Sequence, residues 1–401
     1  MPNQTLFSPG GLMAAAFLCI SVMGCSGSDE SSSSTTEATT TRTVPDDEIR
    51  IGLAGPLTGA QSNIGRGMLN GARMAADELN AAGGVNGKMI TIVEIDDQAD
   101  SDTGVSAANA AIKEGLSGVV GPYNSSVGAA TLPLYIDAGL VPLRLTSADE
   151  TAGLGFTLQP MTSQIAPVAT TAIAEWAGAS AVALIYDNTQ DYTVDARTAM
   201  SNAIAAAGIR ITAEVAITPG ADSYADAVAE ATAGRAELVY VITYYPEGGL
   251  IARAMLESAP GTACLADYGA YDAGYVTAAG VRAAQNCPVV GVPAPNDFPD
   301  SAERVARYTA AFNEAPGTWA PYTYDSVMLL ARVASEVGDL DEASPRSALA
   351  AVSGWHGWTG SVSFELATGN RQPAPVVVLS TRDDGTLRLD EAWRNATGFE
   401  F

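Results

Sequence analysis

Short apolar runs alternate with longer segments of helical periodicity along most of the chain. Residues 49–54 alternate apolar with small or polar side chains, which predicts a strand. Apolar and alanine residues then recur at helical spacing over 68–79, and Gly83 predicts the end of that helix. A second strand is predicted at 89–95. The same alternation predicts two short buried strands with a helix between them, at 118–121, 127–138 and 140–145.

This pattern starts again near residue 181. It predicts three strands and two helices, at 182–186, 192–207, 209–217, 238–243 and 250–257. Strands that alternate with helices form parallel sheets covered by helices on both faces. Because there are two consecutive sets, we expect an α/β fold with two Rossmann-like lobes.

The C-terminal part has a different composition of elements. Three helices and two strands are predicted, at 301–314, 322–337, 347–352, 360–365 and 375–380. Too few strands remain for a third lobe. We therefore expect these elements to complete the first two lobes, so that the chain crosses between them several times.

The N-terminal segment has the features of a signal peptide. Residues 1–24 contain no charged side chain, and their apolar run over 12–23 is too short to span a bilayer. The run ends in Val-Met-Gly-Cys, which resembles a bacterial lipobox with the modified cysteine at Cys25. We expect a signal peptide at 1–24 and a lipid on Cys25. An uncleaved anchor or a soluble secreted form is the alternative.

Residues 25–47 are predicted to be a tether. Between 26 and 43 nearly all residues are Ser, Thr, Gly or acidic, and no large apolar side chain occurs. Such a composition cannot form a core, so we expect disorder. A tether directly after a lipidated cysteine would hold the folded part away from a membrane, which supports lipidation at Cys25.

Composition limits the possible partners. The chain has 401 residues, 47% hydrophobic, and a formal net charge of −25. This length and apolar content suit two domains with real cores. An acidic surface repels nucleic acid and anionic lipid headgroups, so membrane contact is expected only through the lipid anchor. The negative charge by itself indicates no more than solubility.

The cysteines and the single histidine exclude a Cys/His metal cluster. The chain has four cysteines and one histidine, His356. Cys19 lies in the predicted signal peptide, so Cys264 and Cys287 remain for a disulfide in an exported protein. That bond would close a loop of 23 residues and contribute about 3 kcal/mol. Two free buried cysteines are the alternative.

No pattern of catalytic residues is present in the sequence. We find no G-x-S-x-G, no Ser-x-x-Lys near a strand end and no zinc spacing. His356 lies between two tryptophans, where a structural role is expected. We therefore expect a binding protein without catalytic residues, metal or cofactor.

An ordered set of short motifs resembles one family. Its first members are Ile-Gly-Leu-Ala-Gly-Pro-Leu-Thr-Gly at 51–59, Asn-Gly-Ala-Arg at 70–73, Asn-Ala-Ala-Gly-Gly-Val-Asn-Gly at 80–87 and Asp-Asp at 96–97. Later members are Gly-Pro at 121–122, Ser-Ser at 125–126, Tyr-Asp at 186–187, Tyr-Tyr-Pro-Glu at 244–247, Tyr322, Tyr324, Asp325 and Gly-Trp-Thr-Gly at 357–360. From residue 49 to about 382, the chain resembles type I periplasmic binding proteins of the branched-chain amino-acid (Leu/Ile/Val) branch.

The resemblance implies two lobes joined by a three-segment hinge. The first lobe would comprise 49–166 with 294–373, and the second 167–293 with 374–401. Proteins of this family are the solute receptors of ABC importers, so ABC permease subunits would be partners. The resemblance also implies a monomer.

Parallel sheets bind ligands at the carboxyl ends of their strands, and two facing lobes form a cleft there. Ser125 and Ser126 follow a predicted strand and begin a helix, where hydroxyls and free N–H groups can hold a carboxylate. Their alternative role is an ordinary helix cap. Thr146 and Ser147 follow the next strand, and by resemblance their loop contacts the head group of an amino acid. Ala148 stands where the family has a threonine.

Aromatic residues follow the strands of the second half. Tyr192 matches a family tyrosine that lines the cleft, and Tyr244 and Tyr245 follow the next strand. A tyrosine can both stack on a ligand and donate a hydrogen bond. Simple packing is the alternative for each of them.

Asp267 and Tyr268 follow the strand that ends near residue 265. In the amino-acid binders of the family, an acid in this loop pairs with the ammonium group of the ligand. If Asp267 points into the cleft, a cationic amine can be recognised. If it caps a turn, the resemblance leaves an amide, a urea-like solute or a carboxylate.

Together these observations predict an extracytoplasmic lipoprotein that serves an ABC importer. It would capture an amino acid or related small polar solute (amide, urea-like or carboxylate) by hinge closure. A ligand-sensing receptor coupled to signalling is the first alternative. An extracellular enzyme and a purely structural lipoprotein are the others.

Overall fold

The computed structural model describes residues 47–338, 340 and 343–400. The predicted signal peptide, Cys25 and all but the last residue of the predicted tether lie outside this range. Among the described residues, no helix is both long and apolar enough to cross a membrane.

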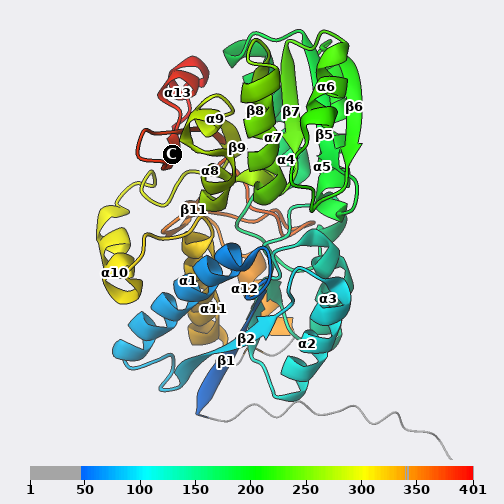
Figure 1. The fold of residues 1–401 in the computed structure, drawn as a ribbon. Helices are drawn as coiled ribbons and strands as arrows, with labels where there is room; N and C mark the ends of the chain where they lie inside the picture. The colour runs from blue at the N-terminus through cyan, green and yellow to red at the C-terminus, as the bar shows by residue number, and fades with distance from the viewer. Residues whose placement is uncertain (1–46, 339, 341–342, 401) are drawn as a thin grey trace, which may run out of the picture. The chain divides into compact units, whose positions relative to one another are not determined.

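One lobe is built on a four-stranded parallel sheet, in the lower half of Figure 1. Its strands follow the order β2-β1-β3-β4 and are β1 (Glu48–Gly55), β2 (Met89–Asp96), β3 (Gly118–Val120) and β4 (Pro142–Leu143). Its helices are α1 (Ser62–Ala81), α2 (Ser101–Lys113), α3 (Ser125–Asp137) and α11 (Ala320–Val337). We call this part the four-stranded lobe.

The second lobe is built on a seven-stranded sheet with the order β13-β12-β9-β8-β7-β5-β6. The strands are β5 (Ala181–Asp187), β6 (Arg210–Ile217), β7 (Leu238–Ile242), β8 (Ala263–Ala266), β9 (Val289–Gly291), β12 (Val377–Thr381) and β13 (Leu387–Leu389). We call this part the seven-stranded lobe. The prediction of an α/β fold with parallel sheets flanked by helices is confirmed for β5 to β9 and for the four-stranded sheet.

The edge of the seven-stranded sheet departs from the parallel pattern. β12 runs antiparallel to β9, and β13 runs antiparallel to β12. β12 and β13 form a hairpin, whose turn is closed by a hydrogen bond from Arg382 N–H to the Thr386 carbonyl at 2.8 Å. A hairpin needs no crossover helix, which is why the alternation of strands and helices did not predict this edge.

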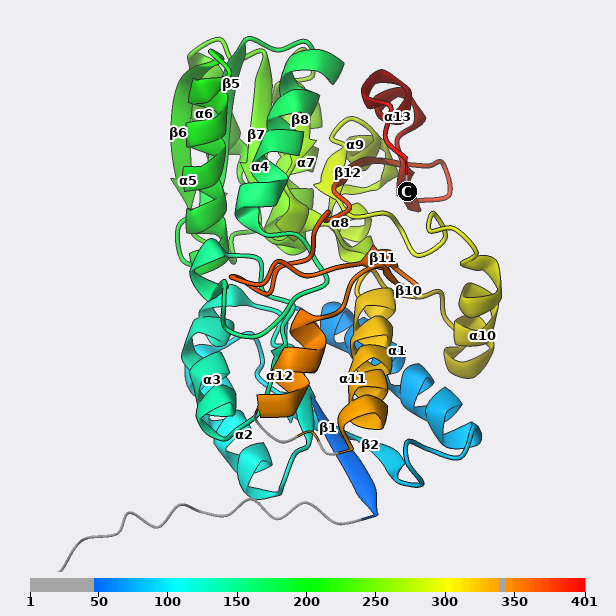
Figure 2. The ribbon, with the colours of Figure 1, turned by 180° about the vertical axis from the view of Figure 1, so that it is seen from behind.

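Helices cover both faces of the seven-stranded sheet (Figures 1 and 2). They are α4 (Thr162–Thr171), which continues as a π-helical turn over Ala172–Trp176, α5 (Asp191–Ala206), α6 (Ala225–Ala233), α7 (Tyr245–Ser258), α8 (Ala273–Ala279), α9 (Val281–Gln285) and α13 (Glu391–Thr397). The expected disulfide between Cys264 on β8 and Cys287 before β9 is present.

The remaining elements are α10 (Ala302–Phe312), α12 (Ala343–Ala350) and a separate hairpin of β10 (Trp355–Gly357) and β11 (Gly360–Val362). Buried Asp325 on α11 accepts hydrogen bonds from the N–H groups of Trp358 and Thr359, at 2.6 and 2.7 Å. A Cβ at Gly357 would collide with that carboxylate. These contacts bring two of the resemblance motifs together.

The chain passes between the two sheets three times: after β4, after β9 and after β11. Two of these passages lie side by side, because Thr157 N–H donates to the Gly369 carbonyl and Arg371 N–H donates to the Thr157 carbonyl, at 2.9 and 3.1 Å. Buried Arg371 also donates to the carbonyls of Leu158 and Thr359. Hydrogen bonds therefore hold these two passages together. The residue limits that we predicted for the lobes stay a prediction.

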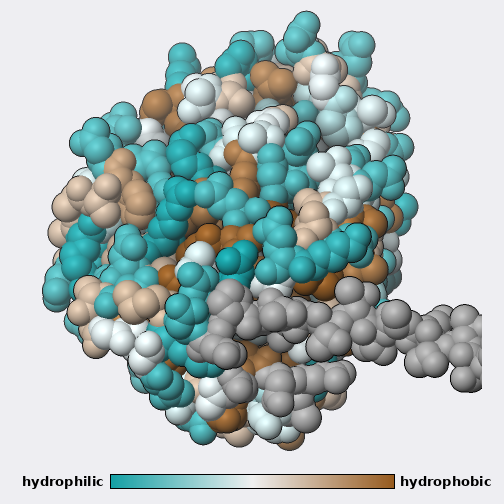
Figure 3. Space-filling view, turned by 90° about the horizontal axis from the view of Figure 1, so that it is seen from below, coloured by the Kyte–Doolittle hydropathy of each residue, from teal (hydrophilic) through white to brown (hydrophobic). Residues whose placement is uncertain are grey.

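The surface of the described residues mixes polar and apolar side chains without one dominant apolar patch in the view of Figure 3. The exposed large apolar side chains are few and scattered: Met89, Val194, Val281 and Leu366. The apolar residues of the strands instead fill the cores beneath the helices.

Candidate functional site

A small cavity lies where the carboxyl ends of strands from both lobes meet. Its lining comes from the loops after β3, β4, β5, β7 and β8: Tyr123, Ser125, Leu145, Ser147, Tyr192, Tyr244, Tyr268 and Gly269. Its volume is about 10 Å³, close to the smallest space that holds a water molecule. The strand ends of a parallel sheet are where α/β proteins bind ligands, so this cavity is the candidate site.

Five aromatic rings encircle this region. Tyr123, Tyr244, Tyr192, Tyr268 and Trp319 follow one another with centroid distances of 6.1, 5.9, 6.5 and 5.4 Å, and Trp319 returns to Tyr123 at 5.4 Å. We call these five residues the aromatic belt. All five are buried. The belt offers ring faces and edges from both lobes to whatever occupies the cavity.

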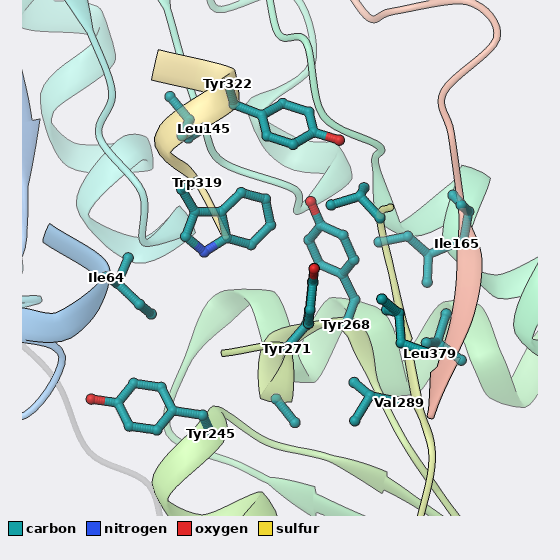
Figure 4. Packing of buried hydrophobic residues seen from close by; sticks show 14 of the residues in the cluster. Ile64, Leu145, Ile165, Tyr245, Tyr268, Tyr271, Val289, Trp319, Tyr322 and Leu379 are labelled. Atoms are coloured by element: carbon teal, nitrogen blue, oxygen red, sulfur yellow. The ribbon is translucent and has the colours of Figure 1, made fainter. Parts of the chain in front are cut away.

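Trp319 joins the belt from outside the strand-end loops. It precedes α11, and Figure 4 shows it with Tyr322 facing Tyr268. Sequence reasoning missed Trp319, because no signal links a residue before a distant helix to these loops. It also missed Tyr123, although Tyr123 lies between β3 and Ser125 and could have been found from that position.

The polar part of the lining comes from two serines. Ser125 is the first residue of α3, and its hydroxyl accepts hydrogen bonds from the N–H groups of Ser147 and Ala148, at 3.3 and 3.1 Å. The Ser147 hydroxyl is buried beside that of Tyr268, and it makes no hydrogen bond of regular geometry. Hydroxyls and the N-terminus of α3 therefore face the same small space.

Asp267 does not line the cavity. Its side chain is fully buried, and its two oxygens accept hydrogen bonds from the hydroxyls of Tyr192 and Tyr240. Burial raises the pKa of Asp267, although the two tyrosine hydrogen bonds oppose that shift. Tyr268, the next residue, lines the cavity instead, and its hydroxyl donates to Gln159 Oε1 at 3.1 Å.

Three other predicted site residues lie near the cavity but outside its lining. The Ser126 hydroxyl accepts from the Asp191 N–H at 3.0 Å, and the Tyr245 hydroxyl donates to the Ala60 carbonyl at 2.5 Å. Each of these bonds joins one lobe to the other. Thr146 is buried, and its hydroxyl shares a hydrogen bond of 2.7 Å with that of Thr151.

Comparison with known proteins places this geometry in a family. Residues 48–386 match the family model described as periplasmic binding protein. The chain belongs to the type I periplasmic binding protein family. The resemblance to its branched-chain amino-acid branch is confirmed by the relatives that follow.

Two relatives of this periplasmic binding protein cover most of its length. It is 27% identical to Leu/Ile/Val-binding protein homolog 2 of Brucella abortus, over 84% of this chain and 92% of that protein. It is 26% identical to the leucine-, isoleucine-, valine-, threonine- and alanine-binding protein of Pseudomonas aeruginosa, over 81% and 85%.

Two crystal structures share the fold of this periplasmic binding protein. The leucine binding protein LivK of Thermotoga maritima has a TM-score of 0.79 at 20% identity, covering 85% of this chain and 97% of that one. The branched-chain amino acid binding protein LivJ of Streptococcus pneumoniae, in complex with isoleucine, has a TM-score of 0.76 at 23% identity, over 86% and 99%.

A buried arginine supports the loop that carries Ser147 in this periplasmic binding protein. Arg144 donates to the Thr146 carbonyl at 3.1 Å and to Asn370 Oδ1, on a passage between the lobes, at 2.6 Å. Burial lowers the pKa of Arg144 to about 9. Sequence reasoning missed Arg144, which follows β4 and donates to the loop without lining the cavity.

The titratable groups of the described residues do not assemble a metal centre. No group of three or more His, Cys, Asp or Glu side chains in that part of the chain could hold a metal ion. The family is one of solute-binding proteins, and the cavity is lined by hydroxyl, aromatic and apolar groups. These groups suit reversible binding of a small molecule.

Proposed function

We propose that this protein captures an amino acid or a related small polar solute between its lobes and presents it to an ABC importer. The observation that carries the proposal is the cavity itself, which both lobes line with hydroxyl and aromatic groups at the ends of their strands. The relatives named as Leu/Ile/Val-binding proteins support this class of ligand. We further propose that the residue limits given above define the lobes and that the protein acts as a monomer.

Capture requires that the lobes separate and close again. The cavity holds no more than about one water molecule, so a ligand enters only when the lobes are apart. It then occupies space that the belt side chains fill in this structure. The three passages between the sheets are the segments where bending can occur. Ligand binding would shift an equilibrium between open and closed forms.

We propose an extracytoplasmic location with a lipid anchor on Cys25. Membership of the periplasmic binding protein family supports the location. The lipobox-like residues before Cys25 support the anchor. Metabolic labelling with a radioactive fatty acid should label the wild-type protein, and Cys25→Ser should remove the label.

The first prediction concerns ligand binding by a fragment of residues 41–401, which contains every residue that the structure describes. A thermal-shift screen of amino acids, amides, urea and small carboxylates should contain a ligand that raises the melting temperature. At 100 times its dissociation constant, a ligand adds about 2.7 kcal/mol of stability. Calorimetry then gives the affinity of the ligand that the screen identifies.

The serine at the start of α3 provides the variant for this test. Ser125→Ala should weaken binding at least tenfold, because the cavity loses a hydroxyl that faces the ligand. Exposed Ser106→Ala on α2 is the matched control and should leave the affinity unchanged. A broad library without any stabilising solute would contradict the proposed function.

A further inference from the structure

We propose that the cavity selects a carboxylate that carries no amine, attached to an apolar or aromatic body. This inference rests on the proposed function and narrows its ligand class. It departs from the amino acids in the names of the related binding proteins. Three features of the site carry it: the groups that can hold an anion, the groups that cannot hold an ammonium, and the aromatic belt.

Hydrogen-bond donors gather at one end of the cavity. The first turn of α3 presents free N–H groups and the positive end of the helix dipole beside Ser125. The hydroxyl of Ser147 faces the same space, is buried and makes no regular hydrogen bond. A carboxylate placed here would satisfy this hydroxyl and the helix N-terminus. No acidic side chain belongs to the lining to oppose it.

A primary ammonium group would find no carboxylate in the lining. Asp267 lies in the loop after β8 beside the lining residue Tyr268, but the hydroxyls of Tyr192 and Tyr240 donate to its two oxygens. Its carboxylate is fully buried behind Tyr192. Tyr268 lines the cavity, whereas Asp267 does not. A phenol hydroxyl carries no negative charge, so it cannot neutralise a buried ammonium group.

The other acidic groups near the loops have partners or point elsewhere. Asp195 accepts from the Asp149 N–H and from the Thr162 hydroxyl. Asp272 accepts from the Gly274 N–H at 2.7 Å and caps α8. Asp97 accepts from the Ala99 N–H with one oxygen, and Asp187 accepts from the N–H and hydroxyl of Thr189. Neither of these acids nor Asp191 lines the cavity. An ammonium in the cavity would therefore be buried without a counter-ion, which is unfavourable.

The aromatic belt and Leu145 suit the body of such a ligand. Four tyrosines of the belt and Leu145 line the cavity, and all are buried. These surfaces offer contacts with a branched aliphatic chain or an aromatic ring. A quaternary ammonium group could also lie on such ring faces, so the experiment includes one.

The test uses pairs of ligands that differ only in the amine. Calorimetry with residues 41–401 compares leucine with 4-methylpentanoate and phenylalanine with 3-phenylpropanoate. At least one amine-free acid should bind at least tenfold more tightly than its amino acid. The absence of a tenfold preference for the amine-free acid in both pairs would overturn the inference.

A second pair of ligands tests whether the faces of the aromatic rings bind a cation. Trimethylglycine and 3,3-dimethylbutanoate have the same shape, but only the first carries a positive charge. The anion 3,3-dimethylbutanoate, which has no cationic group, should bind at least as tightly as trimethylglycine. A clear preference for trimethylglycine would overturn the inference in favour of a cation held by the belt.

The variants Tyr268→Glu and Tyr268→Gln test the missing counter-ion directly. Tyr268→Glu should shift the preference at least tenfold toward the amino acid of each pair, whereas uncharged Tyr268→Gln should not. An unchanged preference in folded Tyr268→Glu would overturn the inference. If neither variant folds, the wild-type ligand pairs decide.

Failure of this inference is distinguishable from failure of the proposed function. Binding of amino acids or amides without the amine-free acids would overturn the inference alone. Absence of any stabilising solute in the broad screen would overturn both.

Discussion

Buried acidic side chains make the stability of this protein depend on pH. Asp97 follows β2 and is 1% exposed. One of its oxygens accepts from the Ala99 N–H at 2.9 Å, and the other makes no hydrogen bond among the described residues. Burial raises the pKa of Asp97 to about 7, with a further contribution from the charge of Asp96. Burial likewise raises the pKa of Asp272 to about 6.

The sign of the effect follows from proton binding. Between about pH 4 and pH 7, the native protein keeps a proton on Asp97 that the unfolded chain releases. The free energy of unfolding therefore falls as the pH rises through this window. Below this pH window Asp97 is protonated in both the native and the unfolded state. Above it Asp97 is ionised in both states, so the native state bears the full cost of a buried charge.

Asp97→Asn should remove this dependence. At pH 8 the variant should be more stable than the wild type by about 1–3 kcal/mol, because a neutral amide replaces a buried charge. Near pH 4 this advantage should disappear. Urea unfolding from pH 4 to pH 8 measures the free energy of unfolding at both ends of this range. Asp102→Asn, at an exposed position, is the control and should change that free energy by no more than about 0.5 kcal/mol. Parallel pH profiles for Asp97→Asn and the wild type would contradict the prediction.

At the scale of elements, α1 packs extensively against α11, a helix about 250 residues further along the chain. A Cβ built on Gly71 of α1 would lie 2.5 Å from Thr323 Oγ1 and would also collide with the Ala320 carbonyl. The Thr323 hydroxyl donates to the Met68 carbonyl at 2.7 Å, which is possible because the two backbones approach so closely. The contact holds α11, and with it Trp319, in place.

Gly71→Ala should therefore destabilise the protein. Alanine favours an isolated helix by about 1 kcal/mol over glycine, but overpacking here should cost more, for a net loss of about 1–3 kcal/mol. Urea unfolding measures the change, and Ser106→Ala on α2 is the exposed control. An increase in the free energy of unfolding would contradict the prediction, because it would show that α1 and α11 can move apart without a loss of stability.

At the scale of the whole molecule, hydrogen bonds join the two lobes to each other in this structure. Besides the bonds of Tyr245 with Ala60 and of Asp191 with Ser126, the Asp149 N–H donates to Asp195 Oδ2 at 2.9 Å. All three lie near the cavity, at the loops after the strands. In the opening that we propose for ligand capture, these hydrogen bonds would be lost, and their loss would contribute to the free energy of opening.

Tyr245→Phe should shift this balance toward the open form. Loss of one hydrogen bond of about 0.5–1.5 kcal/mol should weaken ligand binding by about 2- to 13-fold, mainly through faster dissociation. Stopped-flow kinetics and small-angle scattering measure these changes. Tyr224→Phe is the control, since the Tyr224 hydroxyl donates to the Thr218 carbonyl within one lobe. Equal effects of the two variants would contradict a role in closure.

Much of the fold could be predicted from the pattern of side chains. The strong periodicity of β1, α1, β5 and α5 located these elements to within a few residues for the strands and somewhat less closely for α1. Other elements were missed for physical reasons. α2 is rich in alanine and has few large apolar residues, and α4 contains Pro167 and continues as a π turn.

The sequence by itself determined which loops follow parallel strands, because local periodicity defines each strand and its end. In those loops lie Ser125, Ser147, Tyr192, Tyr244 and Tyr268, all of which line the cavity. Only the tertiary structure decided where each side chain points. Asp267 and Tyr268 are neighbours, yet one bonds to two tyrosines and the other faces the cavity. Such directions depend on contacts with segments far away along the chain, including the one that brings Trp319 to the belt, and no local pattern encodes them.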